Sequence, residues 1–143
     1  MKLPDVNLLV YAANESTAQH APALAWVEET LSGTETVAFA WSVLIGFVRV
    51  ITNPRVLQRP WDPHQAFAVV DGWLAQPPAT VVHPTRRHLA VLRDLLLPLG
   101  TAGNLTSDAH LAALAIEHGA TLCSADVDFS RFPGLRWVDP LAA

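Results

Sequence analysis

Cysteine is nearly absent from this chain, since Cys123 is the only one among 143 residues. A lone cysteine excludes an internal disulfide bond and fits a reducing compartment, so we expect a cytoplasmic protein. No apolar run approaches the roughly 20 residues of a membrane-spanning helix. Lys2 leads directly into Leu-Pro-Asp and not into the apolar run of a signal peptide. We therefore expect neither a membrane segment nor a signal peptide.

Basic residues are also few. The chain has nine of them against 13 acidic residues, which gives a net charge of -4 at pH 7, and Lys2 is the only lysine. This balance argues against binding nucleic acid by bulk electrostatic attraction. If the chain binds a nucleic acid, its arginines must contact the phosphates locally, which a planar guanidinium does well. Arginines on a solvated surface explain the same residues equally well.

Several classes of hydrolase lack their signatures here. The sequence has no GxxxxGK phosphate-binding loop and no GxSxG nucleophile elbow. Asp5-Val6-Asn7 is superficially similar to the acid cluster of aspartyl-phosphate phosphatases and receiver domains. Those families also need a lysine after a later strand, whereas Lys2 lies in the first predicted strand. The sequence therefore favours neither class.

Apolar residues are abundant instead. Hydrophobic residues make up 51% of the chain and charged residues 15%, which excludes a disordered protein. At this length we predict a single domain over residues 1–143 with one core. The apolar surplus also favours a self-association surface.

Short strands alternate with helices, which predicts an α/β fold: an α/β/α sandwich with a mainly parallel central sheet. The first strand and the first helix together are predicted over about residues 2–13, and the later strands over about 36–40, 80–83, 121–123 and 136–138. The later helices are predicted to open at residues 15–17 and run to 31, to follow Ser42 and run to about 52, to cover about 63–74, to follow Thr85 and run to 97, and to run from a cap at Asn104 or Thr106 up to Gly119. The predicted capping residues are Ser42, Asp62, Thr85 and either Asn104 or Thr106.

The most informative stretch is residues 103–128, a predicted helix that Gly119 ends, followed by a short strand. Asp108 lies in the first turn of this helix, where the helix dipole favours an anion. Asp126 and Asp128 follow the strand and fit a polar turn. Each acid therefore has an ordinary structural explanation when it is considered alone.

Taken with the N-terminus, these acids suggest a shared site. Asp5 and Asn7 follow the first predicted strand. If that strand pairs in parallel with the strand that ends at Cys123, Asp5 and Asp126 leave the sheet at the same edge, where ligands bind in open α/β sheets. Asp108 has to approach this edge for the three to form one site.

Carboxylates that converge in one cleft repel one another, and a bound divalent cation removes that conflict. All-oxygen ligation suits Mg²⁺ or Mn²⁺, and such a site supports metal-assisted hydrolysis of a phosphodiester. Ser124 is close enough in sequence to Asp126 to support the metal ligands, or else to cap the turn.

Three segments carry a resemblance to a known family. LPDVNLLVYA, ITNPRV and above all GNLTSDAHLAALAIEHGATLCSADVDFSRFPGLRWVDP resemble the VapC-type PIN-domain ribonucleases, toxins of bacterial toxin–antitoxin pairs. The resemblance implies a PIN-like fold, a Mg²⁺- or Mn²⁺-dependent endoribonuclease, a cognate antitoxin and a homodimer. It also implies that Asp5, Asp108 and Asp126 bind the metal and catalyse RNA cleavage, with Asp128 as a fourth acid and Asn7 near the metal.

One position departs from the family pattern. The family usually carries a glutamate in the helix after the second strand, and Gly46 stands at the matching place. Without this acid, the metal should bind more weakly, or Asp128 should take a larger part in holding it. This leaves open a second interpretation: a PIN-fold module with a decayed metal site that binds RNA or a partner without cleaving.

Two further groups of residues are weaker candidates. His110, His118 and Cys123 could ligate a soft metal, but their spacing fits no zinc pattern. Tryptophan side chains can stack on bases, and Trp61, in a proline-rich loop, is the candidate for this role, although core or interface packing explains it equally well. The sequence does not indicate whether the RNA would be transfer, ribosomal or messenger RNA.

Overall fold

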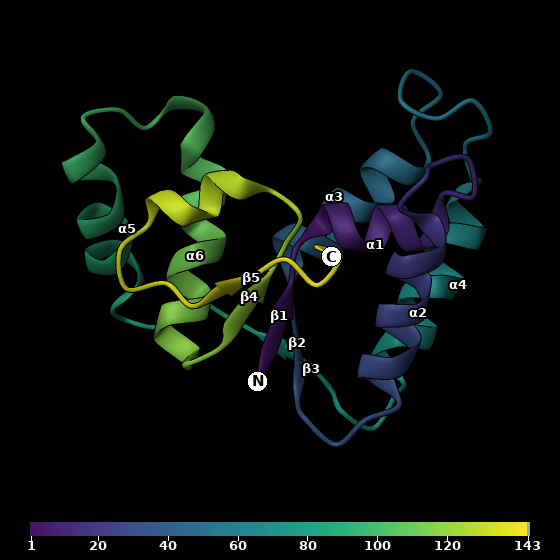
Figure 1. Ribbon diagram of the computed structural model, residues 1–143, viewed down its shortest axis with the longest axis horizontal. Helices are drawn as coiled ribbons and strands as arrows, with labels where there is room; N and C mark the ends of the chain where they lie inside the picture. Colours follow the sequence, from purple (N-terminus) through teal and green to yellow (C-terminus); the bar gives the residue numbers. More distant parts are fainter. Residues whose placement is uncertain (143) are drawn as a thin grey trace.

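The computed structural model describes residues 1–142 (Figure 1). The strands are β1 (Lys2–Pro4), β2 (Val37–Ala40), β3 (Ala79–Val82), β4 (Thr121–Cys123) and β5 (Trp137–Val138). The α-helices are α1 (Val6–Ala13), α2 (His20–Leu31), α3 (Trp41–Ile51), α4 (Pro63–Leu74), α5 (His88–Leu96) and α6 (Thr106–His118). The 3-10 helices are η1 (Leu97–Leu99), η2 (Gly103–Leu105) and η3 (Val127–Arg131). None of the helices within residues 1–142 has the length and apolar character needed to cross a bilayer.

All strand pairs in the sheet are parallel, and their order is β3-β2-β1-β4-β5. Helices α1 to α4 lie on one side of the sheet, and α5 and α6 lie on the other (Figure 1). The predicted α/β/α sandwich with a parallel sheet is confirmed. Because the chain runs outward from β1 to β3 and then returns to β4, the order reverses beside β1. The crevice at the carboxyl ends of β1 and β4 is where such a sheet binds ligands.

The register of β1 and β4 places Asp5 and Ser124, the residues that follow these two strands, side by side. Pro4 pairs with Cys123, and the N–H of Asp5 donates to the carbonyl of Cys123 at 2.9 Å. The predicted parallel pairing of these two strands is therefore confirmed. As a result, Asp5 and Ser124 leave the sheet at the same edge.

The core beneath α3 and α4 is aromatic. Phe39 of β2 stacks with Trp73 of α4 at a centroid distance of 6.2 Å, and Phe47 of α3 meets Trp73 edge-on at 4.7 Å. Phe39 and Phe47 are fully buried. Burying each such ring stabilises the fold by roughly 1.5–3 kcal/mol. This packing fixes α3, one wall of the crevice, against the sheet.

The start of the second helix is a correction to the sequence prediction. A helix was expected from residues 15–17, but α2 begins at His20, because residues 14–19 form turns. The side-chain oxygen of Asn14 accepts from the N–H of Ser16 at 3.1 Å. Asparagine, serine and threonine compete for backbone groups in this way, and periodicity does not reveal it.

Three capping predictions are also wrong. Ser42 lies inside α3, which follows β2 directly, with Ala40 as the extended residue before its first turn. Thr85 lies two residues before Arg87, the residue that precedes α5. Its hydroxyl contacts Glu117 and accepts from the N–H of Arg87 at 3.1 Å, so it caps the turn that leads into α5 and not the first turn of α5 itself. Neither of the two expected residues caps α6, because the 3-10 helix η2 leads straight into it.

The cap at Asp62 agrees with the prediction and can be tested. Its carboxylate accepts from the N–H of Gln65 at 3.0 Å, while the side chain of Gln65 accepts from the N–H of Asp62 at 3.1 Å. We expect Asp62→Ala to cost about 1 kcal/mol of unfolding free energy and to lower the Tm by a few degrees in a circular-dichroism melt. Asp62→Asn keeps an acceptor oxygen and serves as the control. Equal Tm values for the two variants would contradict this role.

Candidate metal centre

Three carboxylates from two separate parts of the chain lie close together. Asp108 lies in the first turn of α6, and Asp126 and Asp128 lie at the start of η3. Each offers one oxygen, and these three oxygens lie within 4.8 Å of one another. A hard divalent cation takes carboxylate oxygens in this kind of arrangement. The donor set therefore fits Mg²⁺ or Mn²⁺.

Asp5 forms the buried wall beside this cluster. It precedes the first turn of α1, and one of its carboxylate oxygens accepts from the N–H of Val6 at 2.7 Å. The other oxygen accepts from the hydroxyl of Ser124 at 2.7 Å. Burial raises the pKa of Asp5 above its ordinary value, these two hydrogen bonds oppose the rise, and the nearby charge of Asp126 adds to it. Asp5 is thus close enough to Asp126 for their charges to interact.

Ser124 connects the residues of this site. It is completely buried, and its hydroxyl oxygen accepts from the amide nitrogen of Asn7 at 3.1 Å and from the N–H of Asp126 at 3.0 Å. The same hydroxyl donates to Asp5. The Ser124 carbonyl in turn accepts from the indole N–H of Trp137 at 3.0 Å. The sequence placed Asn7 and Ser124 near the metal, and here they fix the acids relative to one another.

Asp108 shows how strongly these acids interact. Burial raises its pKa to about 6, and the negative charges of Asp126, Asp5 and Asp128 add to the effect in that order. Such a crowd of like charges disfavours the ionised forms. A divalent cation would offset the repulsion and hold Asp108 in its ionised form.

The side chain of Asp128 is held only weakly. Its side chain pairs with Arg131 at 3.6 Å, and both groups are about half exposed, so the pair contributes little. The N–H of Asp128 donates to a carboxylate oxygen of Asp126 at 2.9 Å. This is the polar turn that the sequence suggested, and the same turn aims both acids at Asp108.

The crevice beside these acids is a cavity of about 320 Å³ between the start of α1, α3 and the start of α6. Asp5 and Asp108 line one side of it. Ser42, Arg49 and Ser107 bring hydroxyl and guanidinium groups to the same cavity. Ser107 was not predicted from the sequence, although its position next to Asp108 could have indicated it.

Comparison with known proteins assigns the family. The PIN domain family model matches residues 2–135. Ribonuclease VapC37 of Mycobacterium tuberculosis is 46% identical over 142 residues, which cover 99% of both chains. The chain belongs to the VapC-type PIN-domain family. Ribonuclease VapC33 of the same species is 43% identical, again with 99% of both chains covered. The VapBC2 structure from Rickettsia felis, bound to a promoter DNA fragment, shares the fold at a TM-score of 0.69, with 21% identity and 96% of each chain covered.

Gly46, the position at which the resemblance implied a missing glutamate, lines the crevice beside Asp5 and Asp108. A side-chain carbon added at Gly46 would lie 3.5 Å from the side chain of Val6, an ordinary contact distance. The structure therefore has room for a side chain at this position. The missing acid leaves the crevice wider and less negative.

The histidines and the cysteine lie apart from the acids. His110 bonds to His88 of α5 through ring nitrogens 2.9 Å apart, and a second nitrogen of His88 contacts Glu117 at 2.5 Å. His118 bonds to the carbonyl of His83 at 2.7 Å, and Cys123 is buried in β4. His110, His118 and Cys123 are therefore divided between the α5–α6 contact, the loop after β3 and the sheet.

The raised pKa of Asp108 predicts how stability depends on pH without metal. Since the folded-state pKa is about 6 and the ordinary value 3.8, the folded state holds the Asp108 proton more tightly. This stabilisation is complete below about pH 3.8 and is lost as the pH rises through about 6. Asp108→Asn has no carboxyl group at this position, so it does not lose this stabilisation as the pH rises. In EDTA at pH 7.5 we expect the variant to be more stable than the wild type by about 1 kcal/mol, because solvent screens this partly exposed group.

Thermal melts between pH 4.5 and pH 8 would measure this difference. Asp94→Asn is the matched control, since Asp94 is exposed on α5 and lies outside the site. A difference between wild type and Asp108→Asn that stays constant across pH would contradict the crowding of charges at Asp108.

Proposed function

We propose that this PIN-domain chain is the toxin of a toxin–antitoxin pair and acts as a Mg²⁺- or Mn²⁺-dependent endoribonuclease that hydrolyses RNA phosphodiester bonds. The observation that carries the proposal is the meeting of Asp108, Asp126 and Asp128 beside Asp5, at the sheet edge where such folds bind ligands. Close relatives over the full chain are named ribonucleases. The RNA substrate and the single buried cysteine fit a cytoplasmic location. We also propose that residues 1–143 form one domain.

The proposed roles follow from the contacts. Asp108, Asp126 and Asp128 hold the ion together with Asp5, which lies beside them. Asp5, Asp108 and Asp126 are the proposed catalytic set. When bound, Mg²⁺ or Mn²⁺ polarises the scissile phosphodiester and lowers the pKa of the attacking water. Ser124 keeps Asp5 oriented through its hydroxyl. Arg49, exposed at the crevice, is placed to contact an RNA phosphate.

Removal of one acid tests the mechanism. We expect Asp126→Ala to lower the rate of RNA cleavage at least about 100-fold, because loss of a ligand should cost as much as loss of the groups that support ligands. Asp5→Ala should have the same effect. Asp94→Ala removes an exposed acid outside the site and should leave the rate unchanged. Cleavage at the wild-type rate by both site variants would exclude this mechanism.

Gly46 favours one alternative, a binding module whose metal site has decayed. Calorimetric titration of Mn²⁺ into the wild type and into Asp5→Asn separates the two functions. The nuclease requires a metal-dependent heat in the wild type that weakens in the variant. RNA binding by the wild type without any such heat would favour the binding module.

The antitoxin needs an apolar surface, and α3 and α4 present one. Trp41, Ile45 and Phe67 are 50%, 65% and 56% exposed, and they line a groove of about 450 Å³. Ile45 and Arg49 line both this groove and the acidic crevice, so the two are continuous. We assign the groove to an apolar segment of the antitoxin whose adjoining residues are basic and reach the acids. The structural neighbour VapBC2 is a complex of this two-component kind.

A charge placed in the groove tests this assignment. We expect Phe67→Asp to abolish co-purification with the co-expressed antitoxin, because a carboxylate cannot be buried there without a partner. Light scattering should still show the homodimer that we propose for the free toxin. Leu89→Asp, at a 65% exposed apolar position on α5, is the control. Loss of the dimer with the antitoxin still bound would assign the groove to self-association instead.

A further inference from the structure

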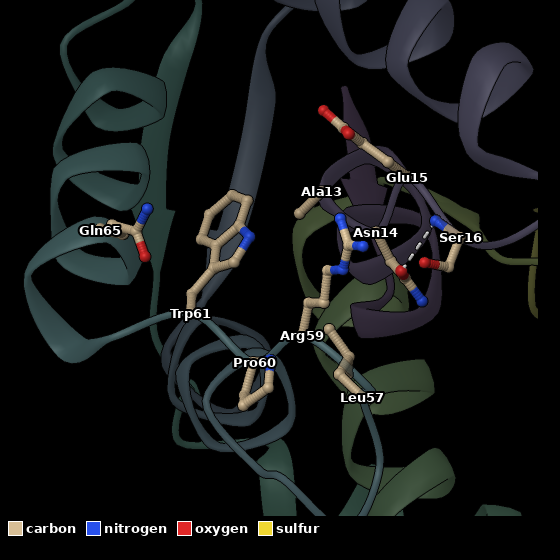
Figure 2. Close-up of a pocket in the computed structure, with 9 residues that line it drawn as sticks. All are labelled: Ala13, Asn14, Glu15, Ser16, Leu57, Arg59, Pro60, Trp61 and Gln65. Carbon is tan, nitrogen blue, oxygen red and sulfur yellow. Dashed lines mark hydrogen bonds between the residues drawn. The ribbon is translucent and has the colours of Figure 1, made fainter.

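A second cavity lies at the far end of α1 from Asp5. It has a volume of about 330 Å³ and is formed by the end of α1, the turn after it, the loop between α3 and α4, and the start of α4. This volume matches the smaller pockets that hold single organic groups. Figure 2 shows the guanidinium of Arg59 between the indole of Trp61 and Asn14, with the carboxylate of Glu15 above them in this view.

The indole of Trp61 is a rigid wall of this cavity. Its ring meets the buried ring of Phe47 edge-on, at 6.2 Å and 83°. The backbone N–H of Trp61 donates to the carbonyl of Ile51 at 2.9 Å, which anchors the loop to the end of α3. A half-buried aromatic ring that is held in this way is a stacking surface for a planar ligand.

The polar groups of the cavity are mostly hydrogen-bond donors. The side-chain oxygens of Asn14 and Gln65 each accept from a backbone N–H, that of Ser16 and that of Asp62 respectively, both at 3.1 Å. Their amide N–H₂ groups are left for a ligand. Arg59 is exposed and, among the ion pairs of residues 1–142, belongs to none. Glu15 adds one carboxylate, so the cavity offers several donors and one strong acceptor.

We propose that this cavity binds an unpaired guanine base of the RNA, an inference that rests on the proposed ribonuclease function. Guanine presents two adjacent acceptors, O6 and N7, which an arginine contacts in bidentate fashion. Its N1–H and N2–H₂ donors suit the carboxylate of Glu15, and its face stacks on Trp61. Adenine would instead bring its amino group against the guanidinium of Arg59.

The distance to the acids fits a substrate that spans both sites. Asp5 precedes α1 and Asn14 follows it, and a helix of eight residues is about 12 Å long. A few nucleotides of single-stranded RNA cover this length. The cavity therefore selects a base a short way along the strand from the bond that is cut, and it supplies local attraction that the net charge of -4 does not.

Nucleotide binding to metal-free protein tests the cavity without any cleavage. The probes are GMP, IMP and AMP, titrated in EDTA while the indole N–H signals are followed by NMR. We expect GMP to bind about tenfold more tightly than AMP, and Arg59→Ala to weaken GMP binding about tenfold. Glu15→Gln should remove the preference for GMP over IMP, which lacks the amino group at C2. Arg55→Ala, an exposed arginine of the same loop outside the cavity, controls for the loss of one charge.

Each result bears on the base assignment separately from the nuclease. Equal affinities for the three nucleotides, or equal effects of Arg59→Ala and Arg55→Ala, would overturn the guanine site while metal-dependent cleavage by the wild type still stood. Weaker antitoxin binding by Arg59→Ala with unchanged GMP binding would also overturn it, since the cavity would then be a protein contact. A wild type that binds GMP as expected but does not cleave RNA would support the cavity and refute the nuclease.

Discussion

Repulsion among four carboxylates at one edge of the sheet is the constraint on which the site depends. The pKa of Asp108 is about 6 because burial and three neighbouring acids disfavour its charge. Carboxylates that repel one another stay close together only where other contacts hold them in place. Here those contacts are made by the Ser124 hydroxyl, which bonds to Asp5, Asn7 and the backbone of Asp126 at once. The backbone hydrogen bonds of β1 and β4 place Ser124 next to Asp5. The free energy of the packed core therefore stabilises a cluster that is unfavourable by itself.

The surfaces around the acids differ in charge and polarity, and therefore in the ligands that they suit. The crevice carries carboxylates on one side and hydroxyl and guanidinium groups beside them, which suits a cation and a phosphate together. The groove of α3 and α4 is apolar and continues from that crevice through Ile45 and Arg49. The cavity at the end of α1 presents donors and one fixed indole. The proposed function would use some of these surfaces for RNA and another for a protein partner.

Local signals gave the elements of the fold where they were strong. Gly119, at the left-handed φ of 65°, ends α6 where the sequence indicated, and Asp62 caps α4 as expected. The prediction failed where side chains bond to nearby backbone in place of forming a helix, as Asn14 does before α2. It also failed at Ser42, because α3 follows β2 without a loop and Ser42 therefore lies inside the helix, past the capping position at Ala40.

The sequence by itself determined the candidate site residues: the acids at positions 5, 108, 126 and 128, and a glycine at position 46. These follow from residue type and spacing, which are local properties. Only the tertiary structure decided that oxygens of Asp108, Asp126 and Asp128 lie within 4.8 Å of one another. It also placed Asp5 beside them, with its carboxylate accepting a hydrogen bond from Ser124. It also decided that the loop carrying Arg59 and Trp61 meets the end of α1. These contacts join residues far apart in the chain, and the pairing of strands and the packing of helices set them.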